Sequence, residues 1–264
     1  GNTLKATGDF NVIEIDNTTF TLTDCKNTGE VTHDTGKTGS GVYNDGGTFN
    51  MYGGNITKNE SNKGGGVYNY TVPPMPGTMD GYTTAIFNMY GGSITGNTAT
   101  ESGGGVYNWG GNVKMYGGDI RQNKASTGGG VHNKPFDNKN ANFYMSSTAS
   151  IEKNEASTSG GGVYSERNTS GSRVDFTMSD SAQITGNTAA TNGGGMCMNG
   201  GYLTVSGKAT ITANTKDDGT TASNVYLLDS GKTVKIDSNG SDFTGTIGVT
   251  TGVTVTENVP VSVA

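Results

Sequence analysis

The sequence predicts an all-β protein, a right-handed, three-sided parallel β-helix of about six regular coils with irregular coils at both ends. Two short motifs alternate six times, in fixed order, along the 264 residues. Glycine supplies 45 residues and recurs at fixed offsets from apolar residues. Apolar and polar side chains alternate over only three or four positions at a time, as in short strands that bury one face. This periodicity argues against disorder, which the 31% hydrophobic content alone would suggest.

The first motif reads Gly-Gly-Gly-Val-Tyr-Asn. Strand alternation turns Val67 inward and Tyr68 outward. The shortest spacing, 25 residues, suits one coil of a three-sided solenoid. The six copies begin at Gly39, Gly64, Gly103, Gly128, Gly160 and Gly193.

The second motif reads Phe-x-Met-Tyr-Gly-Gly-x-Ile-x-x-Asn. Phe87 and Met89 point inward, Tyr90 points outward, and Ile94 begins a third inward position, so each repeat offers three short strands. About four inward side chains at roughly 1.5–3 kcal/mol each cannot offset the ordering of a coil at about 1–2 kcal/mol per residue. Coils must therefore stack. The copies begin at Phe49, Phe87, Val113, Phe143, Phe176 and Leu203.

The asparagines that end the second motif are expected to stack as a ladder at one corner, with their amides bonded to the turn backbone. Opposite charges recur at equivalent places in adjacent coils, at Arg121 and Glu152 and at Lys124 and Glu155. Such pairs support the same register. The ladder residues are Asn59, Asn97, Asn123, Asn154, Asn187 and Asn214.

We predict a single domain, residues 1–264. Residues 1–38 form the opening coils, 39–214 the six repeats and 215–264 the closing strands, and Val253–Val263 forms a last strand or leads into a following module. The apolar runs at the ends are Val12–Ile15, Phe20–Thr23, Asn224–Leu228, Val234–Ile236 and Ile247–Val249.

Charge and cysteine content exclude several classes of function. The net charge of −6 and the pI of about 4.9 disfavour nucleic acid and anionic membranes as partners. No apolar run reaches 18 residues, so no membrane insertion is expected. Cys25 and Cys197 lie in distant repeats and are predicted to be free, packed thiols. No cluster of His and Cys suggests a metal, and no cofactor is predicted.

Several segments together resemble the adhesin-like β-helix repeats of large surface proteins from gut Gram-positive bacteria. Chlamydial polymorphic outer-membrane adhesins are similar more distantly, with Gly-Gly-Ala-Ile where this chain has Gly-Gly-Gly-Val. The resemblance implies a secreted or cell-surface protein, a monomeric part of a larger multidomain protein, and carries over no catalytic residues. The matching segments are Leu22–Cys25 with His33, Gly41–Asn44, Phe49–Gly54, Ile94–Ala99 and Asn224–Leu227.

Loop lengths point to one edge of the solenoid. The connector between the two motifs has four residues in three coils but is long at 70–86, 134–142 and 166–175. Loops of variable length on one edge often bind partners. The single tryptophan, Trp109, lies in a short coil between two long loops. We expect an aromatic site there for a host or environmental glycan or a surface protein. Its candidate residues are Trp109, Tyr70, Tyr82, Phe136 and Tyr107.

Packing is the alternative explanation for these aromatic residues. Trp109 could simply lie beneath the longer loop. The outward tyrosines could stabilise the sheets, although a glycan platform is the competing interpretation. They form two stacks, Tyr43, Tyr68, Tyr107, His132 and Tyr164, and Tyr52, Tyr90 and Tyr116.

A carbohydrate-active enzyme, a polysaccharide lyase or hydrolase, is the alternative function, because such enzymes share this fold. Catalysis there needs carboxylates that converge on one strand face. Of the six positions before the inward isoleucine, only Asp119 is acidic. We therefore predict a protein that is not an enzyme and assign no catalytic residue.

Overall fold

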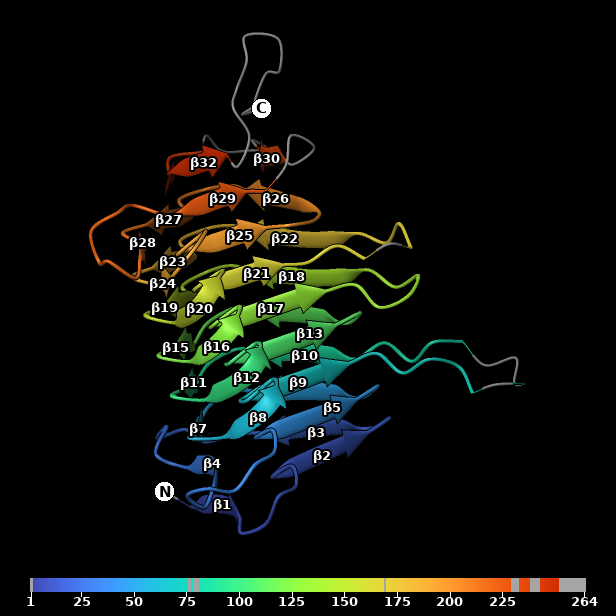
Figure 1. Cartoon of the computed structure of the whole chain (residues 1–264). Helices are drawn as coiled ribbons and strands as arrows, with labels where there is room; N and C mark the ends of the chain where they lie inside the picture. Colours follow the sequence, from blue (N-terminus) through green and yellow to red (C-terminus); the bar gives the residue numbers. More distant parts are fainter. Residues whose placement is uncertain are drawn as a thin grey trace, which may run out of the picture.

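The computed structural model describes residues 2–75, 77, 81–168, 170–228, 233–237 and 243–251. Residues 253–263, for which a last strand or a link was expected, lie outside this set. The described residues form a parallel β-helix in which short strands stack into four parallel sheets (Figure 1). The predicted parallel β-solenoid is thus confirmed. No helix in the described part is long and apolar enough to cross a membrane.

Two sheets carry the two motifs. The tyrosine sheet is built from the first motif, and the phenylalanine sheet from the start of the second. The strands of the tyrosine sheet are β2 (Ile13–Asp16), β5 (Val42–Asp45), β9 (Val67–Tyr70), β13 (Val106–Trp109), β17 (Val131–Lys134), β21 (Val163–Ser165), β25 (Met196–Met198), β29 (Val225–Leu227) and β32 (Val249–Thr251). Those of the phenylalanine sheet are β3 (Thr19–Leu22), β6 (Thr48–Met51), β10 (Ile86–Met89), β14 (Asn112–Met115), β18 (Ala141–Met145), β22 (Val174–Met178), β26 (Tyr202–Val205) and β30 (Thr233–Ile236).

Two further sheets complete each coil. The isoleucine sheet holds the third inward position of the repeat, and the alanine sheet follows the asparagine corner. The strands of the isoleucine sheet are β1 (Thr3–Ala6), β4 (Glu30–His33), β7 (Asn55–Thr57), β11 (Ser93–Thr95), β15 (Asp119–Arg121), β19 (Ser150–Glu152), β23 (Gln183–Thr185), β27 (Thr210–Thr212) and β31 (Thr246–Ile247). Those of the alanine sheet are β8 (Glu60–Lys63), β12 (Thr98–Ser102), β16 (Lys124–Thr127), β20 (Glu155–Ser159), β24 (Thr188–Ala189) and β28 (Thr215–Lys216).

Each regular coil therefore has four strands where the sequence predicted three. The alanine sheet was missed because its strands bury only small side chains. Ala99, Ala125, Ala156 and Ala189 are its buried residues. A single alanine between polar residues gives no apolar alternation from which a strand could be predicted.

The core consists of large apolar side chains stacked in register, many of them identical from one coil to the next. Phe49 pairs with Phe87, and their rings stack 5.0 Å apart. Phe143 and Phe176 repeat the arrangement at 4.9 Å. All four rings are at most 1% exposed, so each coil buries its apolar face on its neighbours.

The predicted asparagine ladder is present and completely buried. Asn97 Nδ2 donates to Asn123 Oδ1 at 3.0 Å and to the carbonyl of Ile56 at 2.9 Å. The backbone N–H of Asn97 donates to the same Oδ1 at 2.9 Å. Asn224 closes the ladder at one end by accepting from Asn214. At the other end, His33 Nδ1 lies 2.7 Å from Asn59 Oδ1.

The sequence did not reveal a second buried ladder, formed by the asparagines of the first motif. Asn44 Nδ2 donates to Asn69 Oδ1 at 2.7 Å, Asn69 to Asn108 at 2.9 Å, and Asn108 to Asn133 at 2.8 Å. Each side chain is fully buried. The position could have been recognised, because two-residue alternation places this asparagine on the same side of the strand as the inward valine.

The structure contains the predicted Lys124–Glu155 ion pair and two free cysteines, but Cys25 is exposed where a packed thiol was predicted. Lys124 and Glu155 form an ion pair at 2.7 Å. Arg121 lies opposite Glu152 in register, but its Nε donates to Ser93 at 3.4 Å. Cys25 and Cys197 are both free, and Cys197 is buried.

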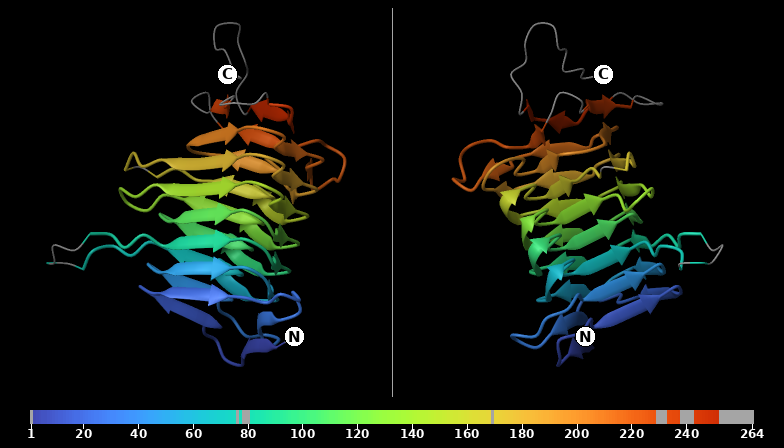
Figure 2. Two further views of the ribbon diagram at one scale, coloured as in Figure 1. Left: turned by 180° about the vertical axis from the view of Figure 1, so that it is seen from behind. Right: turned by 45° about the vertical axis from the view of Figure 1, so that its right-hand side comes forward.

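The loops project mainly from one edge. The loops that follow β9, β17 and β21 extend on the same side of the stack, as two views show (Figure 2). A fourth loop, residues 217–224 between β28 and β29, projects from the opposite side. The sequence predicted that all large variation in loop length lies on one edge of the solenoid. This prediction is confirmed for the first three loops and is wrong for the fourth.

Candidate functional site

Two columns of side chains cover the outer face of the tyrosine sheet. Asparagines of this sheet point inward, so the residues on either side of them point outward. The registers place these outward residues directly above one another. The first column is Glu14, Tyr43, Tyr68, Tyr107, His132 and Tyr164. The second column is Asp16, Asp45, Tyr70, Trp109 and Lys134.

The five aromatic residues predicted as a site come together, and we call them the aromatic cluster. The Trp109 ring lies 4.6 Å from Phe136 and 5.1 Å from Tyr70. Tyr70 and Phe136 are 5.5 Å apart, and Tyr82 lies 6.4 Å from Phe136. Tyr107 lies 6.3 Å from Trp109. Three neighbouring coils and two loops therefore contribute to one cluster.

The two long loops hold each other over Trp109. Tyr82 Oη donates to Asp137 Oδ2 at 2.9 Å, and Lys139 Nζ lies 4.9 Å from the Tyr82 ring centre. Gly110 makes this approach possible, because a Cβ there would lie 2.6 Å from Phe136 Cβ. The space beside Trp109 between the two long loops is thus occupied by the loops' own side chains.

Exposure separates the members of the aromatic cluster. Trp109, Tyr70, Tyr82 and Phe136 are partly exposed, whereas Tyr107 is only 3% exposed. Tyr107 therefore supports the Trp109 ring from below and offers little surface of its own. Packing and binding are both compatible with this geometry, since Trp109 is enclosed on several sides yet still reaches solvent.

Burial keeps the tyrosines of the first column neutral. It raises the pKa of Tyr43 to about 12, and it raises the pKa of Tyr68 and Tyr107 as well. Neutral phenols donate and accept hydrogen bonds. The middle of this surface is therefore aromatic and uncharged.

Carboxylates gather where the two columns begin, near the N-terminal end. Asp16 lies directly opposite Asp45, and Glu14 lies two residues away on the same face. Burial, followed by the charges of Asp16 and Glu14, raises the pKa of Asp45. The Asp45 carboxyl is thus protonated more easily than an ordinary exposed aspartate.

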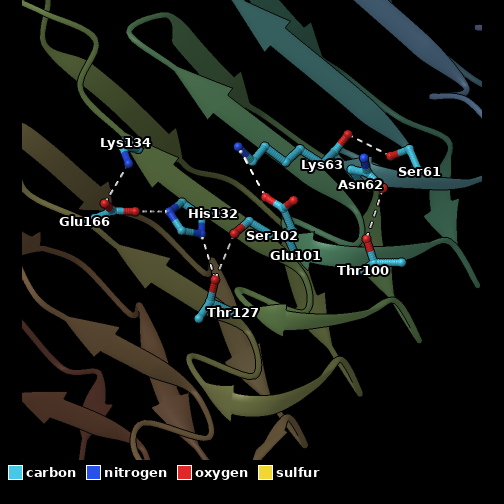
Figure 3. Close-up of polar contacts among 10 residues, drawn as sticks. All are labelled: Ser61, Asn62, Lys63, Thr100, Glu101, Ser102, Thr127, His132, Lys134 and Glu166. Atoms are coloured by element: carbon cyan, nitrogen blue, oxygen red, sulfur yellow. Dashed lines mark hydrogen bonds and ion pairs between the residues drawn. The ribbon is translucent and has the colours of Figure 1, made fainter.

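A hydrogen-bonded chain lies further along the same face (Figure 3). His132 Nε2 lies 2.8 Å from Glu166 Oε2, and Lys134 Nζ lies 2.7 Å from Glu166 Oε1. Thr127 Oγ1 is 3.1 Å from His132 Nδ1 and 2.9 Å from Ser102 Oγ.

These contacts set the charge states of the chain. Burial lowers the pKa of His132, so the ring is neutral. Burial alone would raise the pKa of Glu166, but hydrogen bonds from His132 and Lys134 hold it at about 2. Sequence reasoning missed this chain because Glu166 belongs to a loop outside both motifs.

The second tyrosine stack has little ring face to offer a sugar. Tyr52 and Tyr90 stack 4.5 Å apart with an interplanar angle of 9°, and Tyr90 and Tyr116 stack 5.2 Å apart at 15°. All three are exposed, but their inner faces cover one another. This geometry fits sheet stabilisation better than a glycan platform.

Metal ligands are not grouped in the described ranges, where no set of three or more His, Cys, Asp or Glu residues could hold an ion. Asp119 is flanked in register by Ser93 and Ser150. Burial raises the pKa of Asp119, and Glu152, two residues along the neighbouring strand β19, adds to this, whereas Arg121 lowers it.

Comparison with known proteins adds no relative to this geometry: no protein-family model, no curated protein and no solved structure matches the chain.

Proposed function

We propose that the chain is a non-catalytic binding module of a secreted or cell-surface protein. It acts as a rigid solenoid that displays an aromatic binding surface along one edge. The observation that carries this proposal is the meeting of Trp109, Tyr70, Tyr82 and Phe136 at partly exposed positions. Amphipathic aromatic rings on a fixed scaffold suit contact with a glycan or a protein.

The rigid scaffold supports the same proposal. Stacked coils advance the chain by about 4.8 Å each, and the buried ladders fix one coil on the next. The loops that carry Tyr82 and Phe136 are tied together by the Tyr82–Asp137 bond. A ligand would therefore meet a surface that is already ordered, which lowers the entropy cost of binding.

The test is binding of the protein to arrays of immobilised glycans and of extracellular-matrix proteins. Trp109→Ala is compared with Tyr202→Ala, which removes an exposed aromatic side chain from the phenylalanine sheet. The proposal expects at least one ligand whose binding is lost in Trp109→Ala and kept in Tyr202→Ala. Binding that survives Trp109→Ala would refute the assignment to the aromatic cluster.

A polysaccharide hydrolase is the second candidate, on one observation. Asp16 and Asp45 face each other beside the aromatic cluster, and burial, followed by the charges of Asp16 and Glu14, raises the pKa of Asp45. Glycoside hydrolysis uses two carboxyl groups of unequal acidity. Release of reducing ends from neutral polysaccharides, abolished by Asp45→Asn and by Asp16→Asn, would establish this activity. Absence of release under conditions where a glycan binds would exclude it.

A further inference from the structure

We propose that a hollow beside Phe10 is a subsite for an uncharged saccharide, and this inference rests on the proposed binding function. The hollow has a volume of about 380 Å³ and lies between the start of the tyrosine sheet and the first strands of the alanine sheet. That volume falls within the range of small-molecule sites. It is separate from the aromatic cluster, whose residues do not line it.

Phe10 supplies an aromatic wall. Its side chain is 60% exposed, among the highest values for a large apolar residue in the described part. The ring packs on Gly8, where any Cβ would collide with it. His33 Nε2 lies 2.8 Å from the carbonyl oxygen of Phe10. The backbone is thereby fixed, and a ring held at the rim of a hollow can stack on the apolar face of a sugar.

Carboxylates with free hydrogen-bonding capacity line the hollow. Glu14 and Glu60 both face it, and neither carboxylate has a hydrogen-bond or ion-pair partner among the described residues. Each can accept hydrogen bonds from sugar hydroxyls. Asn62 Oδ1 accepts from Thr100 Oγ1 at 3.2 Å, which orients the amide and leaves its N–H groups available as donors.

The remaining walls are preformed. Asp9 Oδ1 accepts from the backbone N–H of Thr38 at 2.9 Å, and Asn11 Oδ1 accepts from the backbone N–H of Ser40 at 3.0 Å. These bonds join the segment before β2 to the segment before β5. Because the walls are cross-linked before any ligand arrives, the hollow needs no reorganisation to bind.

Charge selects the class of ligand. Glu14 and Glu60 carry the uncompensated charge of the hollow, since Asp9 Oδ2 lies 3.5 Å from Lys37 Nζ. Asp16 and Asp45 lie further along the same face. A uronate or a sulfated sugar would meet like charges, and this repulsion would suppress its binding. A neutral sugar offers hydroxyl donors to the same carboxylates. A sugar is also small enough to enter a concave site, whereas a protein partner would present a broad, flat surface.

Side chains of the first column connect the hollow to the aromatic cluster. Glu14 lies opposite Tyr43, Tyr43 lies 5.1 Å from Tyr68, and Tyr68 lies 6.5 Å from Trp109. A linear neutral oligosaccharide that enters the hollow can therefore extend along the tyrosines to Trp109. Affinity is expected to rise with chain length until both ends are occupied.

The test is isothermal titration calorimetry with cello-, manno-, malto- and chito-oligosaccharides of two to six sugars, and with oligogalacturonates as acidic counterparts. Phe10→Ala removes the ring, Phe10→Trp restores an aromatic face, and Tyr202→Ala is the control. We expect a neutral oligosaccharide to bind the wild type, Phe10→Trp and Tyr202→Ala alike, and Phe10→Ala at least tenfold more weakly. Oligogalacturonates are expected not to bind.

Three results would overturn the inference: unchanged affinity in Phe10→Ala, tighter binding of oligogalacturonates than of neutral chains, or no neutral oligosaccharide bound at all. Trp109→Ala separates these results from failure of the proposed function. Binding lost in Trp109→Ala but unchanged in Phe10→Ala removes the subsite and leaves the binding module intact. Binding unchanged in both variants removes both assignments.

Discussion

Ile15 lies directly opposite Asn44 on the neighbouring strand, and Asn44 Oδ1 has no hydrogen-bond donor among the described residues. The second asparagine ladder therefore begins with an orphaned acceptor. At its other end Ser165 follows Asn133 in register, and the Ser165 hydroxyl also lacks a partner there. An apolar or short side chain at each end leaves the ladder incomplete, in contrast to the first ladder, which His33 and Asn224 complete.

Extending the second ladder by one amide should offset part of the stability that is lost when the buried Ile15 is replaced. Ile15→Ala is expected to lower the free energy of unfolding by about 2–5 kcal/mol, because it leaves a cavity. Ile15→Asn places an amide donor opposite Asn44 Oδ1 and should cost at least about 1 kcal/mol less than Ile15→Ala. Urea unfolding of the two variants measures the difference. A larger loss in Ile15→Asn would contradict the orphaned-acceptor interpretation.

Interrupting the first ladder should strongly lower the free energy of unfolding, because the ladder is buried. Asn123→Ala removes the acceptor used by both the backbone and the side chain of Asn97, and the donor to the Ile94 carbonyl. Several buried groups lose partners, so we expect a loss of about 3 kcal/mol in the free energy of unfolding. Lys114→Ala, on an exposed position of β14, should change it by less than about 0.5 kcal/mol. Equal effects would argue against the ladder.

The His132–Glu166 pair should make stability depend on acid pH. The pKa of Glu166 is lowered from 4.5 to about 2, so its contribution is complete above pH 4.5 and is lost as pH falls toward 2. The pKa of His132 is lowered from 6.5, so stability also declines as pH falls below 6.5 and the unfolded chain takes up a proton.

Glu166→Gln should flatten the pH dependence between 4.5 and 2, as measured by the urea midpoint at successive pH values. Glu155→Gln is the matched control, since its ion pair with Lys124 is exposed and contributes little. A wild-type pH profile in Glu166→Gln would show that another group governs acid unfolding.

The facing carboxylates of β2 and β5 should be a source of instability. Like charges directly opposite on adjacent strands repel each other, and removal of one is worth about 0.2–1 kcal/mol. Asp45→Asn is therefore expected to raise the free energy of unfolding at pH 7, and Asp16→Asn should do the same. The double variant should gain less than the sum of the two single variants, because each alone removes the repulsion. Additive gains would show that the two groups do not interact.

Much of the architecture follows from periodicity alone. Strand alternation around Val67, Phe87 and Ile94 located three of the four sheets, because each inward column repeats one large apolar residue. The fourth sheet carries alanines such as Ala125, whose small side chain gives no such pattern. Its strands form because the chain must return from the asparagine corner to the glycine corner alongside the coil before it.

The candidate site could be predicted from the sequence only where the repeats set the register. Trp109 and Phe136 could be brought together from loop lengths and stacking order, and the structure places their rings 4.6 Å apart. The hollow at Phe10 could not be found in this way. It depends on contacts between the irregular opening segment and later coils, such as the hydrogen bond from the backbone N–H of Ser40 to Asn11 Oδ1, for which the repeats provide no register.

The two ladders also carry aligned dipoles along the axis of the solenoid. In both, each side-chain amide donates to the carbonyl oxygen of the asparagine in the following coil, so the amide dipoles point the same way along the stack. As with aligned peptide units in a helix, their partial charges cancel inside the column and remain at its ends. The oxygen ends lie at Asn44 and Asn59, in the N-terminal coils. The β-helix is therefore a polarised rod whose negative pole lies in the same coils as the carboxylates of β2 and β5.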